Sequence, residues 1–313
     1  TIIDKCTKLI RSTRDIDVDI TKIPMDDEKT FSLLQNANTN GVFQLESGGM
    51  QKWLRELGPT VFEDIIAMNA LYRPGPMDYI PDFVARKRNP KKIKYLHPLL
   101  EPILKDTLGV IVYQEQVMQI SQAMGGFSMP EADKLRKAMG KKIAHIVDSM
   151  EEKFLKGAKE RGIGPKIAGE VYNAMKEFSK YGFNKSHSAA YALISYQTAF
   201  LKANYTIEYM ATLLSSQPDN QDDVIQYVND CKSMGIQVLP PDINTSEYDF
   251  TVQGSSIRFG LGAIKGVGSK VIESIISSRS KNGFTSLREF LENIENTVLN
   301  KGVLESLIKA GAL

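Results

Sequence analysis

Five side chains suited to a planar, anionic ligand lie within the seven residues from Tyr181 to His187. They are two aromatic rings, an amide, a cation and an imidazole, contributed by Tyr181, Phe183, Asn184, Lys185 and His187. After them, apolar and small residues from about Ser188 to Asn204 predict a helix that is apolar on nearly every side and therefore buried. Ser186 or Ser188 is expected to cap it. Because the free N–H groups of a helix N-terminus suit phosphate, the segment predicts a phosphate-binding loop; the alternative is a plain turn before a core helix.

A second group of basic residues lies between residues 134 and 142, a window without any acid. It contains Lys134, Arg136, Lys137, Lys141 and Lys142. Cations crowded on a helix without acids are mildly destabilising, so the cluster predicts an anionic partner rather than simple solvation. The run 86–94 also lacks acids, but here a solvated loop is the favoured interpretation. Arg73, before Pro74, either stabilises the end of a helix as a C-terminal cation or belongs to a functional site.

A third candidate is the turn Ile264-Lys265-Gly266-Val267-Gly268, which leads into an apolar-periodic helix. The pattern is that of the hairpin in a helix-hairpin-helix element. Glycines in such a turn let main-chain N–H groups face a phosphate without obstruction by Cβ. Lys265, Gly266 and Gly268 are therefore candidates for contact with a nucleic-acid backbone.

A reaction centre is not evident. Asp15, Asp17 and Asp19 alternate as metal-binding carboxylates on a strand do, but their surroundings favour a solvated acidic loop. There is no Ser-His-Asp order, Walker loop or zinc-deaminase pattern. Two distant cysteines and three scattered histidines indicate neither a zinc site nor a disulfide framework, which fits a reducing, cytoplasmic compartment. We expect no catalytic residue, no metal ligand and no membrane-spanning segment in this chain.

Apolar periodicity predicts a mainly α protein. Helices are expected at 1–14, from Asp26 or Asp27 through Asn36, and at 48–57, 59–71, 79–88, 98–105, 114–124, 131–139, 146–161, 165–178, 219–234, 270–278, 287–294 and 303–308. A strand is expected at 109–113, and a hairpin from 248–252 and 256–261 around the turn 253–255. The chain is expected to divide into 1–45, a helical domain at 46–234, a small β unit at 235–262 and a helix-hairpin-helix region at 263–313.

Six blocks resemble one known family, in the same order along the chain. They are G-V-F-Q-L-E-S (41–47), A-L-Y-R-P-G-P (70–76), V-Y-Q-E-Q-V-M (112–118), L-R-K-A-M-G-K-K (135–142), Y-G-F-N-K-S-H-S-A-A-Y (181–191) and A-I-K-G-V-G (263–268). Over essentially its whole length the chain is similar to the bacterial replicative DNA polymerases of family C. The resemblance implies the end of the palm at 1–45, a multi-helix fingers domain at 46–234 and the start of the helix-hairpin-helix region. Where the family has two adjacent arginines in the fingers, this chain has Arg136-Lys137, and lysine offers only a point charge.

The reaction that the resemblance implies is transfer of a nucleotide from a deoxynucleoside triphosphate (dNTP) to a primer 3′ end. In this family Mg²⁺ is held by palm aspartates that precede the stretch matched here. The chain, which begins with Thr1 rather than Met, is therefore expected to be an inactive piece of a longer enzyme. Implied partners are primer–template DNA, dNTP and other replisome subunits such as the sliding clamp. The alternative is a non-catalytic nucleic-acid-binding module.

The resemblance also implies roles for individual residues. Arg136, Lys137, Lys141, Lys142 and Lys185 would neutralise triphosphate or template phosphates, and Arg73 would brace the same cleft. The rings of Tyr181, Phe183 and His187 would pack near the nascent base pair, and Asn184 would orient a neighbour or a sugar. Lys265, Gly266 and Gly268 would hold duplex backbone without reading its sequence.

Overall fold

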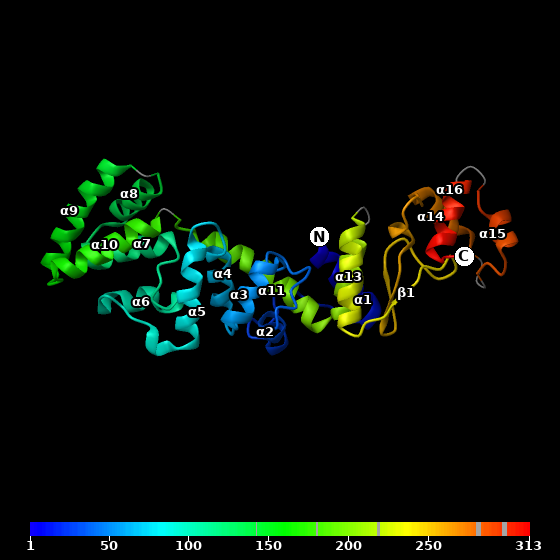
Figure 1. Cartoon of the computed structure of the whole chain (residues 1–313), viewed down its shortest axis with the longest axis horizontal. Helices are drawn as coiled ribbons and strands as arrows, with labels where there is room; N and C mark the ends of the chain where they lie inside the picture. Colours follow the sequence, from blue (N-terminus) through cyan, green and yellow to red (C-terminus); the bar gives the residue numbers. More distant parts are fainter. Residues whose placement is uncertain (142, 180, 218–219, 280–282, 296–298) are drawn as a thin grey trace. The chain divides into compact units, whose positions relative to one another are not determined.

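The computed structural model describes residues 1–141, 143–179, 181–217, 220–279, 283–295 and 299–313, and its helices and strands are drawn in Figure 1. The chain forms two compact units. Unit 1 combines Thr1–Ile23 with Gln197–Leu313, and unit 2 is Pro24–Tyr196. Helix α11 (Lys185–Asn204) contains the boundary between them. The predicted mainly α class is confirmed, whereas the division into four parts stays a prediction.

Unit 2 is helical, and one of its cores lies between α7, α8, α9 and α10. Ile120, Phe154 and Tyr172 are fully buried there. The elements of this unit before α11 are α2 (Glu28–Gln35), α3 (Gly48–Leu57), α4 (Phe62–Leu71), η1 (Pro76–Tyr79), α5 (Ile80–Arg88), η2 (Pro90–Lys92), η3 (Pro98–Leu100), α6 (Glu101–Leu104), η4 (Lys105–Thr107), α7 (Gln114–Gly125), α8 (Met129–Gly140), α9 (Ala144–Glu160) and α10 (Pro165–Ser179).

Among the described residues of unit 1, buried apolar side chains form two clusters. In the first, Cys6 and Ile10 of α1 pack with Leu201 and Tyr209; the second is built from residues between Ile243 and Ala312. Its elements besides α11 are α1 (Ile2–Arg14), α12 (Thr206–Ser215), α13 (Gln221–Ser233), β1 (Val238–Leu239), β2 (Thr251–Gln253), β3 (Ser256–Arg258), η5 (Leu261–Ala263), α14 (Ser269–Ser278), α15 (Leu287–Asn293) and α16 (Lys301–Ala310).

The predicted hairpin is confirmed, with shorter strands. Strands β2 and β3 are antiparallel, and Gln253 pairs with Ser256, so the turn is Gly254-Ser255, with Gly254 at φ 62°. Strand β1 joins β3 in parallel. It was not predicted because two residues carry no detectable alternation.

The predicted strand at 109–113 is wrong. The side-chain oxygen of Gln116 accepts hydrogen bonds from the main-chain N–H groups of Val112 at 2.8 Å and Tyr113 at 3.0 Å. These two N–H groups are therefore not available for hydrogen bonds to a neighbouring strand. In the described part of the chain, the β contact of this segment is a single parallel bridge between Tyr113 and Phe183.

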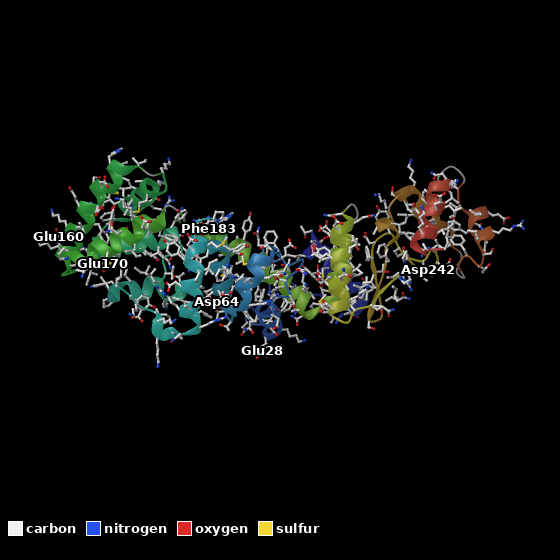
Figure 2. All side chains as sticks on the ribbon, viewed as in Figure 1. Glu28, Asp64, Glu160, Glu170, Phe183 and Asp242 are labelled. Carbon is white, nitrogen blue, oxygen red and sulfur yellow. The ribbon has the colours of Figure 1, made fainter. Side chains whose placement is uncertain are left out.

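Several helix boundaries also differ from prediction. The helix expected at 98–105 is divided into η3, α6 and η4. Helix α4 begins at Phe62 rather than at 59, because the carboxylate of Asp64 (labelled in Figure 2) accepts from the N–H groups of Thr60 and Val61.

Helix α11 departs from prediction at its start and on its surface. It begins at Lys185, and the side chain of Asn184 accepts from the N–H of His187 at 2.8 Å, so the cap is Asn184 and not Ser186 or Ser188. The helix is also not buried on every side: Tyr191, Leu193 and Ile194 are exposed. An apolar helix surface is therefore open in unit 2.

Candidate functional site

The residues Tyr181–Asn184, here called the aromatic loop, are joined to the start of α7. Phe183 forms the β-bridge with Tyr113, and its carbonyl accepts from the N–H of Gln114 at 2.9 Å. The side-chain amide of Gln114 donates to the carbonyl of Gly182, also at 2.9 Å. These contacts place the aromatic loop beside a segment 68 residues earlier in the sequence.

Arg73 reaches the aromatic loop from the end of α4. Its guanidinium carbon lies 4.0 Å from the centre of the Phe183 ring, and Nη2 donates to the carbonyl of Tyr181 at 3.0 Å. Nε donates to the carbonyl of Ala70 at 2.9 Å, which satisfies one of the last carbonyls of the helix. Burial lowers the pKa of Arg73, since desolvation disfavours the charged form.

A backbone turn at Gly75 makes room for the loop. Gly75 has φ 101°, and a Cβ at this position would lie 2.4 Å from Cε1 of Tyr181. The Arg-Pro-Gly-Pro turn therefore needs glycine both for its dihedral angle and for the close approach of the Tyr181 ring.

Arg136 and Lys185 meet the same junction from two other helices. Arg136 of α8 donates through Nη1 to the side-chain oxygen of Gln114 at 3.0 Å. The ammonium of Lys185 lies 5.5 Å from the centre of the Tyr113 ring, within the range of a cation–π contact. Arg73, Arg136 and Lys185, three of the predicted cations, thus converge on the aromatic loop and the residues paired with it.

The cation cluster on α8 has an acidic partner, Asp133, which directly precedes the acid-free window 134–142. Asp133 forms ion pairs with Arg136 at 2.7 Å and with Lys137 at 2.6 Å. Lys137 and then Arg136 lower the pKa of this carboxyl by hydrogen bonding. The interpretation of the cluster as cations without acids is therefore wrong. Lys137 and Lys141 are exposed, and Lys142 lies outside the described residues.

The N-terminus of α11 already has an anionic partner, so the expectation of an open phosphate site there is wrong. The carboxylate of Glu115 accepts from the main-chain N–H of Lys185 at 3.0 Å and from the side chain of Asn184 at 2.7 Å. A carboxylate at a helix N-terminus is favoured by the helix dipole. Asn184 is thereby fixed between Glu115 and the first turn of the helix.

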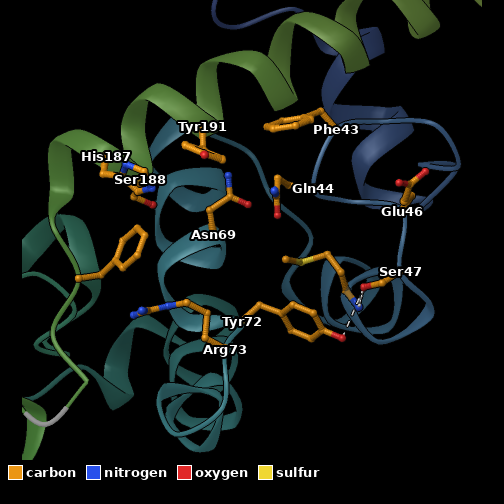
Figure 3. A pocket seen from close by; sticks show the side chains of 12 residues that line it. Phe43, Gln44, Glu46, Ser47, Asn69, Tyr72, Arg73, His187, Ser188 and Tyr191 are labelled. Carbon is orange, nitrogen blue, oxygen red and sulfur yellow. Dashed lines mark hydrogen bonds between the residues drawn. The ribbon is translucent and has the colours of Figure 1, made fainter. Parts of the chain in front are cut away.

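A cavity of about 550 Å³ opens beside the aromatic loop (Figure 3). One wall is a row of rings: Phe183 lies 5.3 Å from His187, His187 lies 4.5 Å from Tyr191, and Tyr191 lies 5.7 Å from Phe43 between centroids. Ring pairs at these distances attract one another. The cavity is lined by Phe43, Gln44, Glu46, Ser47, Met50, Asn69, Tyr72, Arg73, Phe183, His187, Ser188 and Tyr191.

Arg73, Phe183 and His187 were predicted site residues, but most of the cavity lining was not. Gln44, Asn69 and Tyr72 present polar groups to it (Figure 3). Gln44 has φ 64°, an uncommon angle for a residue with a Cβ. Gln44 lies in the block 41–47 and Tyr72 in the block 70–76, so the resemblance could have marked both, but neither side chain has the positive charge that drew attention to Arg73 and Lys185.

The glycine turn in unit 1 has the predicted form. Gly266 has φ 87°, and a Cβ there would lie 2.9 Å from Oγ of Ser306. Gly268 is the N-cap of α14, with no described atom within 4 Å of the point where a Cβ would lie. Lys265 is exposed. The turn therefore presents open main chain at the start of a helix.

The acidic stretch near residue 15 is exposed, as predicted. Hydrogen bonds from Thr21 and Lys22 lower the pKa of Asp19 to about 2. In the described part of the chain, no group of three or more histidine, cysteine, aspartate or glutamate side chains could hold a metal ion. Among the described helices, none combines the length and apolar character needed to cross a bilayer.

Comparison with known families identifies the chain. The profile of the bacterial DNA polymerase III alpha subunit finger domain matches residues 1–162, more than half of the chain. The chain belongs to this family. A helix-hairpin-helix motif matches residues 235–313, so the predicted presence of a fingers domain and of a helix-hairpin-helix element is confirmed, while the predicted bounds of the two regions stay a prediction.

Curated DNA polymerase III alpha subunits are similar over the whole chain. The subunit from Thermus aquaticus is 46% identical, with 100% of this chain and 26% of the relative aligned. That from Neisseria meningitidis serogroup B is 49% identical, over 100% and 27%, and that from Borreliella burgdorferi is 49% identical, over 99% and 27%. The chain thus spans about a quarter of the length of these DNA polymerase III alpha subunits and corresponds to one region of them.

Proposed function

We propose that the chain is the fingers region of a replicative DNA-directed DNA polymerase, which binds the triphosphate of an incoming dNTP and primer–template DNA. The observation that carries this proposal is the convergence of Arg73, Arg136 and Lys185 on the aromatic loop and its partners Tyr113 and Gln114. Arg73 and the row of rings line one cavity, and Arg136 and Lys185 contact Gln114 and Tyr113 next to the aromatic loop. Cations and rings grouped in this way suit a ligand that has both phosphates and a base.

In the proposed complex the cations neutralise phosphate. Arg136 is held by Asp133 and Gln114, so its fork has a fixed direction, which favours a directional contact with phosphate oxygens. Lys185, the exposed Lys137 and Lys141, and Lys142, which lies outside the described residues, are proposed to supply further positive charge. Arg73 braces the aromatic loop.

The rings are proposed to pack near the nascent base pair. Phe183 and His187 belong to the aromatic wall of the cavity, and Tyr181 packs against the Gly75 turn. Asn184 orients its neighbours, because it bonds both to Glu115 and to the first turn of α11. In unit 1, Lys265, Gly266 and Gly268 are proposed to contact duplex backbone.

Mg²⁺ is expected to be required for nucleotide transfer, but the described residues do not fit a magnesium site. They contain no cluster of three or more candidate ligands, whereas Mg²⁺ in polymerases is held by carboxylates. We therefore propose that its ligands lie in palm residues outside this chain, that the chain alone is inactive, and that replisome partners such as the sliding clamp bind the full-length protein.

The proposal is tested in the full-length polymerase by Arg136→Ala and Lys185→Ala. Each substitution removes a charge proposed to bind triphosphate, so the apparent KM for dNTP should rise about tenfold or more, the effect of losing a hydrogen bond to a charged group. Arg55→Ala and Lys166→Ala, which remove exposed cations elsewhere in unit 2, should leave this KM unchanged. The KM values are measured by steady-state nucleotide incorporation. If the KM of Arg136→Ala and of Lys185→Ala equals that of the controls, neither residue belongs to the site.

A second candidate is favoured by the helix-hairpin-helix match at 235–313. A chain of this kind without palm carboxylates acts as a non-catalytic nucleic-acid-binding module. It differs from the first proposal in predicting duplex binding without a dNTP requirement.

A further inference from the structure

Gln114 occupies the point where the aromatic loop meets Arg136. It is the first residue of α7, and its main-chain N–H donates to the carbonyl of Phe183 at 2.9 Å. Its side chain uses both ends of the amide: Nε2 donates to the carbonyl of Gly182 at 2.9 Å, and Oε1 accepts from Nη1 of Arg136 at 3.0 Å. One side chain thus bonds to the loop on one side and to a charged group of α8 on the other.

The contact with the loop is close. A Cβ at Gly182 would lie 3.1 Å from Cγ of Gln114, tighter than an ordinary van der Waals contact. Little space is therefore left between the main chain of the aromatic loop and the Gln114 side chain, and the hydrogen bond to the carbonyl of Gly182 joins the two.

The contact with Arg136 completes the fixation of its guanidinium. Nε and Nη2 of Arg136 donate to the same oxygen of Asp133, at 3.0 and 2.7 Å. These bonds come from the preceding turn of the same helix and hold one edge of the fork. The bond to Gln114 holds the other edge, so the guanidinium plane is set before any ligand arrives, and less rotamer freedom is lost when an anion binds.

We propose that Gln114 is a positioning residue for the nucleotide site. It holds Arg136 and the aromatic loop at a fixed spacing, so that one dNTP meets the cation with its triphosphate and the rings with its base. This inference rests on the proposed function. Gln114 itself is not a catalytic residue, because it acts through Arg136 and the loop.

The test is Gln114→Met in the full-length polymerase, with dNTP kinetics as the readout. Methionine has a similar length and shape but neither donates to Gly182 nor accepts strongly from Arg136. The apparent dNTP KM should rise about tenfold, the effect of one lost hydrogen bond to a charged group, with a much smaller change in kcat. Gln119→Met replaces an exposed glutamine on the same helix and should leave KM unchanged.

A double-variant cycle separates positioning from a merely structural role. Because Gln114 acts partly through Arg136, the rise in KM of Arg136→Ala combined with Gln114→Met should be smaller than the product of the rises in the two single variants, since interacting residues are not additive. Fully additive factors would overturn the inference. If Gln114→Met does not fold, Gln114→Glu, which keeps an acceptor for Arg136 but cannot donate to Gly182, should still raise KM.

Failure of this inference differs from failure of the proposed function. An unchanged KM in Arg136→Ala overturns the role of Arg136 in nucleotide binding and the role of Gln114 with it. A raised KM in Arg136→Ala beside an unchanged KM in Gln114→Met, or in Gln114→Glu, overturns only the positioning role.

Discussion

Arg73 shows how one side chain can serve a helix and a site at once. The sequence left open whether this cation stabilises the end of a helix or belongs to a functional site. The bond from its Nε to the carbonyl of Ala70 confirms the first alternative, and the stacking on Phe183 brings the same guanidinium to the aromatic loop. Removing Arg73 would therefore disturb two elements, which makes it a poor probe of ligand binding.

Gly75 gives a cleaner probe of the same junction. Gly75→Ala should destabilise unit 2 by about 2 kcal/mol or more, because alanine is strained at φ 101° and its methyl group would collide with Tyr181. Gly48→Ala, at a helical position with no described atom within 4 Å of the added carbon, should be neutral or mildly stabilising. Urea unfolding followed by circular dichroism measures both; equal stability of the two variants would show that Tyr181 does not need the glycine.

At the scale of the element, the sequence predicted those helix boundaries that depend on neighbouring residues. Helices α1, α3 and α14 begin and end within a residue or two of prediction, because apolar periodicity and caps are properties of neighbouring residues. The hairpin was readable for the same reason: a glycine turn separates two alternating stretches.

The sequence-based predictions are wrong where a side chain from elsewhere in the chain accepts the hydrogen bond of a main-chain N–H group. Gln116 uses the N–H groups that a strand at 109–113 would need, and Glu115 closes the N-terminus of α11, which lies 70 residues away in the sequence. Tertiary contacts of this kind override local preference. The same limit applies to the site. The positive charges of Arg73, Arg136 and Lys185 marked them as candidates, whereas Asn69, which is uncharged and lies in none of the six blocks, lines the cavity through tertiary structure alone.

The glycine turn before α14 offers a test of main-chain contact with DNA. Gly268→Ala should leave the fold intact, since Gly268 has φ −80° and open space around it. A methyl group there would nonetheless keep phosphate away from the N–H groups, so duplex affinity should fall about tenfold. Fluorescence anisotropy with labelled duplex measures the loss, with Gly164→Ala, an equally open glycine in unit 2, as the control. Unchanged affinity would exclude Gly268 from the interface.

At the scale of the whole molecule, the proposed functions separate in one pair of assays. In buffer with Mg²⁺, dNTP and primed template, this chain should not extend the primer, while the full-length polymerase does. Its binding to duplex should be weak and should fall with added salt, with a log–log slope steeper than about −3 as several phosphate contacts are lost. Primer extension by the chain alone would contradict the proposal that the chain is inactive by itself, and salt-independent binding would contradict the proposed nucleic-acid interface.

Unit 2 is inserted between two parts of unit 1, and its ends are tied together. The hydroxyl of Tyr196 donates to the carbonyl of Pro24 at 2.8 Å and accepts from the N–H of Asp27 at 3.1 Å. A domain whose first and last residues lie close together can be inserted into another domain without disrupting it.

This arrangement sets an order of events on the ribosome, where chains emerge from the N-terminus and domains fold as units. Helix α1 is made before unit 2, but Cys6 and Ile10 on its apolar face can contact Leu201 and Tyr209 only after all of unit 2 has been translated. The inserted unit can complete its fold as soon as Tyr196 emerges. The packing of the apolar face of α1 within its own unit is therefore delayed until the rest of unit 1 is synthesised.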